Sequence, residues 1–102
     1  MRVVYSPRAT RDLEHIAVYY RSVADPNIAA AISERIEYVI NRMARRPHSA
    51  PPVVERRDVR AVLVLRYPYK IFYRVRDDAV EILHIRHTAR RAWEEDEGGQ
   101  DS

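Results

Sequence analysis

The spacing of apolar residues changes once along the chain, and this change constrains the fold more than any other feature. From residue 7 to residue 46, apolar side chains recur every three or four residues, which is the spacing of amphipathic helices. From residue 60 to residue 87 they follow the shorter period of β-strands. Helical and strand patterns in separate blocks predict an α+β fold, in one domain for a chain of 102 residues.

Two start signals divide the helical block into a pair of helices. Ser6-Pro7 and Asp25-Pro26 each place an N-cap residue before a proline at the first helical position. The helices are separated by only a few residues, so we expect an antiparallel hairpin that ends at Arg46-Pro47. The expected buried stripes are Ala9, Leu13, Ile16, Ala17 and Tyr20 in the first helix, and Ala29, Ile32, Ile36, Val39, Ile40 and Met43 in the second.

Four strands complete the predicted architecture. The first is residues 2–5, and the others, at 60–65, 69–76 and 80–87, have short connections that predict a β-meander. The expected order is β-α-α-β-β-β: an N-terminal strand, then an antiparallel helical hairpin packed on a small antiparallel sheet. A short C-terminal helix is expected to start at Thr88. We place the domain at residues 1–93 and expect the acidic residues 94–102 to be a disordered tail.

Charge is distributed unevenly along the chain. There are 18 basic and 15 acidic residues, and five of the acidic residues lie in residues 94–102, so residues 1–93 carry 18 basic against 10 acidic residues, a net charge of +8. This charge predicts an acidic partner or a nucleic acid. The chain has no cysteine, so disulfides and thiolate chemistry are excluded. It has no apolar run long enough for a membrane span or a signal peptide.

The basic surface is predicted on one face of the middle strand. Tyr69 and the residues that alternate with it, to Val75, suit the core, so the intervening residues form the other face. In the last strand, apolar residues at 82, 83 and 85 fall on both faces, which indicates a bulge, cover by the final helix, or a bound partner. The residues expected to bind an acidic partner or a nucleic acid are Lys70, Phe72, Arg74, Arg76, Arg86, Arg90 and Arg91.

Motifs for catalysis are few. The two glycines lie at 98 and 99, so there is no glycine-rich phosphate loop, and no cofactor or small-molecule substrate is expected. His84 and His87 are three apart on a strand and point to opposite faces, so no metal site is expected. His87 lies beside several arginines, where an imidazole can act as acid or base on a bound phosphate ester.

Three segments together carry a family resemblance. Residues 4–9, 66–75 and 80–91 resemble the RelE/ParE toxins of bacterial type II toxin–antitoxin systems, and the resemblance extends over residues 2–93. It implies the same order of strands and helices. It also implies a cytoplasmic, plasmid-stabilisation type protein that inhibits growth until a cognate antitoxin binds it. Such antitoxins wrap the toxin with an extended, partly acidic C-terminal segment.

The resemblance leaves two activities open. The RelE-like branch implies an endoribonuclease that cuts messenger RNA on the ribosome, for which the candidate residues are Lys70, Arg74, His87 and Arg90. The arginine that follows the last strand in that branch falls near Thr88, with Arg86 and Arg90 as displaced substitutes. The late tyrosine of that branch falls near Trp93 or Glu94, and neither replaces it. The ParE-like branch implies a DNA gyrase inhibitor without a catalytic set. The long hairpin and residues 67–75 are closer to ParE, so we predict gyrase inhibition, with ribonuclease activity and a non-toxic nucleic-acid-binding module as alternatives.

Overall fold

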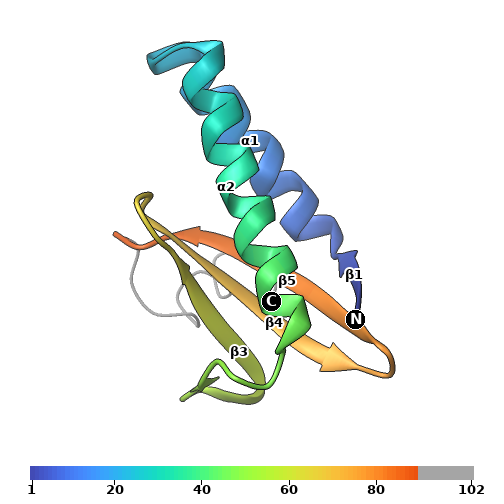
Figure 1. The fold of residues 1–102 in the computed structure, drawn as a ribbon. Helices are drawn as coiled ribbons and strands as arrows, with labels where there is room; N and C mark the ends of the chain where they lie inside the picture. Colours follow the sequence, from blue (N-terminus) through green and yellow to red (C-terminus); the bar gives the residue numbers. More distant parts are fainter. Residues whose placement is uncertain (90–102) are drawn as a thin grey trace.

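The computed structural model describes residues 1–89, apart from the side chain of Arg57, and places two helices against one face of a five-stranded sheet (Figure 1). The predicted α+β class and the N-terminal strand are confirmed. Thr88 and Ala89 form a turn. The expected C-terminal helix and the acidic tail otherwise lie outside the described residues. The elements are β1 (Arg2–Tyr5), α1 (Pro7–Val23), α2 (Pro26–Arg45), β2 (Pro52–Val53), β3 (Arg56–Val64), β4 (Tyr69–Arg76) and β5 (Ala79–His87).

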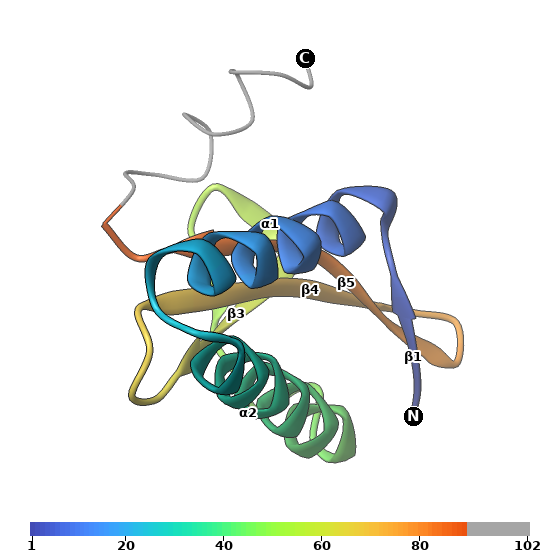
Figure 2. The same cartoon turned by 90° about the horizontal axis from the view of Figure 1, so that it is seen from above.

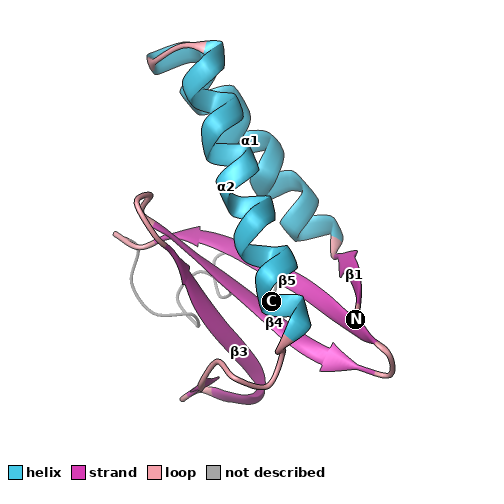
Figure 3. Ribbon diagram, in the orientation of Figure 1, coloured by secondary structure: helices cyan, strands magenta, loops and turns pink. Residues whose placement is uncertain are grey.

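The sheet has the strand order β1-β5-β4-β3-β2 and is mixed (Figure 3). The predicted meander of β3, β4 and β5 is antiparallel and confirmed. The expectation of a wholly antiparallel sheet is wrong, because β1 pairs parallel to β5. Parallel strands cannot be joined by a tight hairpin, and here the two helices and the strands β2, β3 and β4 all lie between β1 and β5 in the chain. The two-residue β2 was not predicted, and β3 begins at Arg56 instead of residue 60.

Both helices begin at the predicted caps. The Ser6 hydroxyl accepts a hydrogen bond from the Ala9 amide at 3.0 Å. The Asp25 carboxylate accepts from the amides of Asn27 and Ile28 at 2.8 and 3.1 Å. Proline follows each cap, where its missing N–H has no helical partner to lose. Among the described elements, α1 and α2 both fall short of the apolar length that a bilayer crossing requires.

The main core lies between the hairpin and the sheet. Ile32, Ile36 and Ile40 of α2 are almost fully buried and pack with Ile71 and Tyr73 of β4. Seen from above, α1 runs along β5 (Figure 2). The far end of the hairpin projects beyond the sheet, so the residues around its turn have no sheet beneath them (Figure 1).

Buried tyrosine hydroxyls lie at the rim of this core. Tyr73 donates a hydrogen bond to the Pro47 carbonyl at 2.6 Å and so holds the connector that follows α2. Burial raises the pKa of Tyr73, against the opposing charge of Arg60. Burial also raises the pKa of Tyr69, and its contact with the Tyr20 hydroxyl adds to this. Both tyrosines therefore stay neutral in the folded state at a pH where they ionise in the unfolded chain.

These raised pKa values predict a loss of stability at alkaline pH. Below about pH 10 both states hold the protons, so the stability is fully present. As the pH rises further, the unfolded chain loses protons that the folded chain keeps, and the free energy of unfolding falls by about 1.4 kcal/mol per pH unit for each such tyrosine. Urea unfolding at pH 8 and pH 11 measures this slope. Tyr73→Phe is expected to flatten it, and an unchanged slope in that variant would contradict the assignment.

Candidate partner-binding site

The face of the sheet away from the helices carries the predicted basic residues of the middle strand. Lys70, Phe72 and Arg74 lie on this open face, as the alternation of β4 predicts. Across the strands, Lys70 pairs with Arg86, Phe72 with His84, and Arg74 with Glu81. Directly opposite residues share a face, so these pairs lie side by side.

Phe72 is the centre of a second, small apolar cluster on this open face. It is only 2% exposed and packs with Val59, which is fully buried. The His84 ring stacks on it with centroids 5.8 Å apart. The Arg86 guanidinium lies 5.0 Å from the ring centroid and the Lys70 ammonium 5.9 Å, both within cation–π range. Phe72 therefore organises the basic side chains around it instead of projecting toward solvent.

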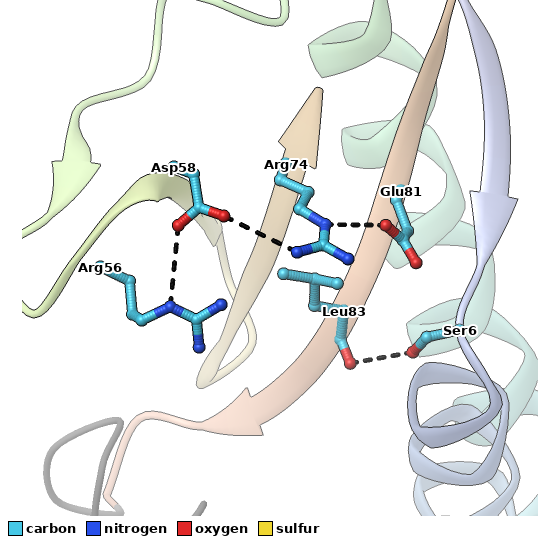
Figure 4. Close-up of polar contacts among 6 residues, drawn as sticks. All are labelled: Ser6, Arg56, Asp58, Arg74, Glu81 and Leu83. Carbon is cyan, nitrogen blue, oxygen red and sulfur yellow. Dashed lines mark hydrogen bonds and ion pairs between the residues drawn. The ribbon is translucent and has the colours of Figure 1, made fainter. Parts of the chain in front are cut away.

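Arg74 belongs to a chain of ion pairs that crosses three strands (Figure 4). Its Nε donates to Glu81 of β5 at 2.8 Å, and its Nη1 lies 3.6 Å from Asp58 of β3. Asp58 also lies 3.7 Å from the Nε of Arg56. Two carboxylates thus compensate two guanidiniums, and this part of the open face has far less positive charge than the sequence alternation indicated.

A β-bulge explains the irregular pattern of the last strand. Phe72 pairs with His84 while the next residue, Tyr73, pairs with Ile82, so Leu83 is an extra residue in β5. The bulge turns Ile82 and Ile85 into the main core and leaves Leu83 packed against the Phe72 cluster. Of the three explanations that the sequence left open, the bulge accounts for the pattern without a bound partner.

Sequence reasoning missed the role of α1 at the edge of β5. Just beyond the end of β1, Ser6 continues the hydrogen bonding to β5. Its amide donates to the Ile82 carbonyl at 2.9 Å, and its hydroxyl donates to the Leu83 carbonyl at 3.0 Å (Figure 4). Asp12 then accepts from the Ile85 amide at 2.9 Å and lies 2.7 Å from His84 Nδ1. In the sequence, the only indication of this role was that Asp12 lies next to the apolar stripe of α1. These contacts close an edge that would otherwise expose backbone groups.

The double role of Ser6 gives a prediction. We expect Ser6→Ala to lower the free energy of unfolding by about 2 kcal/mol, because it removes the α1 cap and the bond to the bulged strand. Asp25→Ala is the matched control, since Asp25 caps α2 at the exposed end of the hairpin, and we expect it to cost about 1 kcal/mol. Urea unfolding followed by circular dichroism measures both, and an equal or smaller loss for Ser6→Ala would contradict the tie to β5.

The candidate ribonuclease residues are divided between the two faces of the sheet. His87 pairs with Tyr69 and lies on the helical face, with the two rings edge to face at 5.4 Å, whereas Lys70 and Arg74 lie on the open face. The His87 Nδ1 accepts from the Ala89 amide at 3.0 Å, so this nitrogen is already engaged. Arg90 and Arg91 lie outside the described residues. Within residues 1–89, the structure does not bring the three candidates together.

The other predicted site residues, Arg76, Arg86 and the two histidines of β5, differ in exposure and in the face of the sheet on which they lie. Arg76 is exposed at the end of β4, and Arg86 is 8% exposed. His84 and His87 lie on opposite faces, as predicted. In the part of the chain that the structure describes, no three His, Asp or Glu side chains are grouped to hold a metal ion.

Comparisons with known proteins agree with this geometry. The chain is similar in fold to the chromosomal ParDE toxin–antitoxin system of P. aeruginosa, with a TM-score of 0.77 and 23% identity over 85% of this chain and 95% of that one. It is also similar to the YoeB/ParE toxin of Agrobacterium tumefaciens (TM-score 0.62, 17% identity, 85% and 98% covered) and to the E. coli RelE toxin (TM-score 0.62, 14% identity, 97% and 95% covered). No curated protein matches significantly. The model of the ParE toxin family of type II parDE toxin–antitoxin systems matches residues 3–92, and the chain therefore belongs to this family.

Proposed function

We infer that this ParE-family toxin inhibits bacterial growth by acting on DNA gyrase in the cytoplasm, and that a cognate antitoxin neutralises it. Family membership supports the toxin role. The similar P. aeruginosa structure is described as a ParDE system, which supports an antitoxin partner for this chain. Loss of such an antitoxin would release the toxin, which is the basis of plasmid stabilisation.

One observation favours gyrase inhibition over RNA cleavage. Phosphoryl transfer needs its acid–base group and its cationic groups around one phosphate. Here His87 is on the helical face while Lys70 and Arg74 are on the open face, and Arg74 is held by Glu81 at 2.8 Å. An inhibitor that works by binding needs no such convergence.

The direct test is a supercoiling assay with purified gyrase, relaxed plasmid and ATP. The purified toxin is expected to block supercoiling in proportion to its concentration, and addition of the antitoxin is expected to restore supercoiling. Gyrase that supercoils fully in excess toxin would overturn the proposal.

The ribonuclease alternative has its own assay. Programmed ribosomes with labelled messenger RNA are incubated with toxin, and the gyrase proposal predicts intact message. Cleavage that Lys70→Ala or His87→Ala abolishes would instead establish the endoribonuclease. Both residues are at least partly accessible, so the substitutions are expected to leave the fold intact.

For the antitoxin we propose the open face of the sheet as the contact surface. The proposed residues remain Lys70, Phe72, Arg74, Arg76 and Arg86, with Arg90 and Arg91. Arg76 is exposed, and Lys70 is partly exposed beside the buried Phe72, so these two cations are the most direct contacts for an acidic segment.

Charge reversal tests the antitoxin surface. The binding partner in this test is the cognate antitoxin, which family membership implies. A double variant of Lys70→Glu and Arg76→Glu is expected to weaken binding at least tenfold by calorimetry. The control is Arg11→Glu with Arg21→Glu, which makes the same charge change on the exposed side of α1. Equal weakening by both double variants would reject a specific surface.

A further inference from the structure

The exposed side of α2 carries a row of arginines around one tyrosine. Its opposite side is the buried stripe that contains Ile32, Ile36 and Ile40. Residues three, four or seven apart on a helix lie on the same side. The row, which we name the α2 stripe, consists of Arg35, Tyr38, Arg42 and Arg45. From the first to the last of them the helix rises about 15 Å, at 1.5 Å per residue.

Tyr38 lies within a cluster of guanidinium groups. Arg42 Nη1 donates a hydrogen bond to its hydroxyl oxygen at 3.3 Å, and the Arg35 guanidinium lies 5.0 Å from its ring centroid. The hydrogen bond and charge of Arg42, with smaller effects from Arg35 and Arg45, lower the pKa of Tyr38 against its ordinary value. The hydroxyl accepts from Arg42, so its own proton remains available for an anionic oxygen. The tyrosine is 50% exposed, which leaves ring surface for a ligand.

An open groove continues the α2 stripe onto the turn between β3 and β4. Arg66 and Tyr67 of this turn face α2 across a volume of about 310 Å³. Arg66 has φ of 81°, a left-handed conformation that is unfavourable for a residue with a Cβ atom. The turn places Arg66 and Tyr67 on the other side of the groove from Arg35 and Tyr38, with a strained backbone at Arg66. The groove is lined by Ala31, Glu34, Arg35, Tyr38, Arg66 and Tyr67.

Among residues 1–89, the arginines of this surface form no ion pair, in contrast to Arg74 on the open face of the sheet, although Glu34 also lines the groove. Arg74 on the sheet has carboxylate partners at 2.8 and 3.6 Å. Among the described residues, no carboxylate forms an ion pair with the arginines of the α2 stripe or with Arg66. The Nε of Arg35 is buried without a hydrogen-bond acceptor in that part of the chain, a placement that costs desolvation free energy. A fully solvated arginine would avoid this cost.

From these observations we propose that the α2 stripe and its groove bind single-stranded nucleic acid. Arginines in a row match a chain of phosphates, and a half-exposed aromatic ring in a basic groove is the usual platform on which a base stacks. An acidic peptide would share the charge contacts but has no bases to stack on the Tyr38 ring, so nucleic acid is the ligand that uses both features. Arg42, Arg45 and Arg66 contact phosphates, and Tyr38 stacks on a base and donates its hydroxyl to a phosphate oxygen. This surface is separate from the sheet face proposed for the antitoxin.

The experiment is fluorescence anisotropy of a labelled 20-nucleotide single-stranded DNA of mixed sequence, titrated with the full chain between 50 and 200 mM KCl. We expect the logarithm of the affinity to fall linearly with the logarithm of salt concentration, by about 0.7 for each phosphate contacted. The double variant Arg42→Ala with Arg45→Ala is expected to bind at least tenfold more weakly and to show a smaller slope. Tyr38→Leu is expected to bind about fivefold more weakly or worse, with an unchanged slope, since stacking does not depend on counterion release.

Matched control variants distinguish binding at the α2 stripe from non-specific attraction to the overall positive charge of the chain. Arg11→Ala with Arg21→Ala removes two exposed arginines of α1, and Tyr19→Leu removes a tyrosine that is 56% exposed on the same hairpin. Both controls are expected to bind within twofold of the parent chain. The proposal would be overturned if either control weakened binding as much as the corresponding variant of the α2 stripe, or if no binding occurred at 50 mM salt. It would also be overturned if a 20-residue polyglutamate competed more strongly than unlabelled DNA. All substitutions are at partly or fully exposed positions, and circular dichroism verifies their fold.

Discussion

Phe72→Ala is expected to lower the free energy of unfolding by about 3–5 kcal/mol, the usual cost of truncating a buried aromatic residue. The sequence pattern places Phe72 on the face away from the helices, where a solvent-exposed or partner-bound residue would be expected. In the structure it is 2% exposed, stacked on His84 at 5.8 Å and packed with Val59. Its removal leaves a cavity and takes away the ring over which Arg86 lies at 5.0 Å. Urea unfolding of the purified chain measures the loss.

Leu63→Ala is the control for this prediction. Leu63 pairs with Lys70 and lies on the same open face, but it is 54% exposed. We expect its truncation to change stability by no more than about 0.5 kcal/mol, as for an ordinary surface position. Phe72→Leu, which refills most of the volume, is expected to recover more than half of the loss. Similar small effects for Phe72→Ala and Leu63→Ala would show that the second cluster contributes no stability.

Asp12→Ala is expected to cost about 2–4 kcal/mol, since one carboxylate satisfies two groups at the edge of β5. It accepts from the Ile85 amide at 2.9 Å and from His84 Nδ1 at 2.7 Å, and an ionised carboxylate can only accept, so the nitrogen carries the proton. The substitution leaves the Ile85 amide without its acceptor and loosens α1 from the sheet.

Two neighbouring variants make this result specific. Both contacts are made by the same Asp12 oxygen, Oδ2, so Asp12→Asn can keep them while losing the charge, and we expect it to lose less stability than Asp12→Ala. Glu14→Ala removes an exposed carboxylate two residues further along α1 and is expected to be nearly neutral. If Asp12→Ala and Glu14→Ala unfold at the same urea concentration, the carboxylate does not hold the strand edge.

The elements that were predicted well are those whose signals are local. Ser6-Pro7 and Asp25-Pro26 start α1 and α2 as predicted, because an N-cap and a fixed proline φ act within one turn of helix. The apolar stripe of α2 buries Ile32, Ile36 and Ile40, because a helix has only one side to turn toward the sheet.

The features that were not predicted depend on pairs of residues far apart in the chain. The parallel pairing of β1 with β5 and the bonds of Asp12 to β5 join positions more than 70 residues apart. The bulge at Leu83 changes the register between β4 and β5, and the apolar pattern of β5 alone does not specify that register.

The basic surface is the clearest example of a feature that the sequence predicts only in part. Net charge and strand alternation are properties of the chain, so the basic character of residues 1–93 and the shared β4 face of Lys70, Phe72 and Arg74 follow from the amino-acid order alone. Which of these charges remain available to a partner depends on the folded arrangement. Strand pairing brings Glu81 and Asp58 to Arg74 and covers Phe72, whereas the α2 arginines form no ion pair within residues 1–89. Coulomb energy depends on distances between side chains, and those distances are fixed only when the sheet and hairpin assemble.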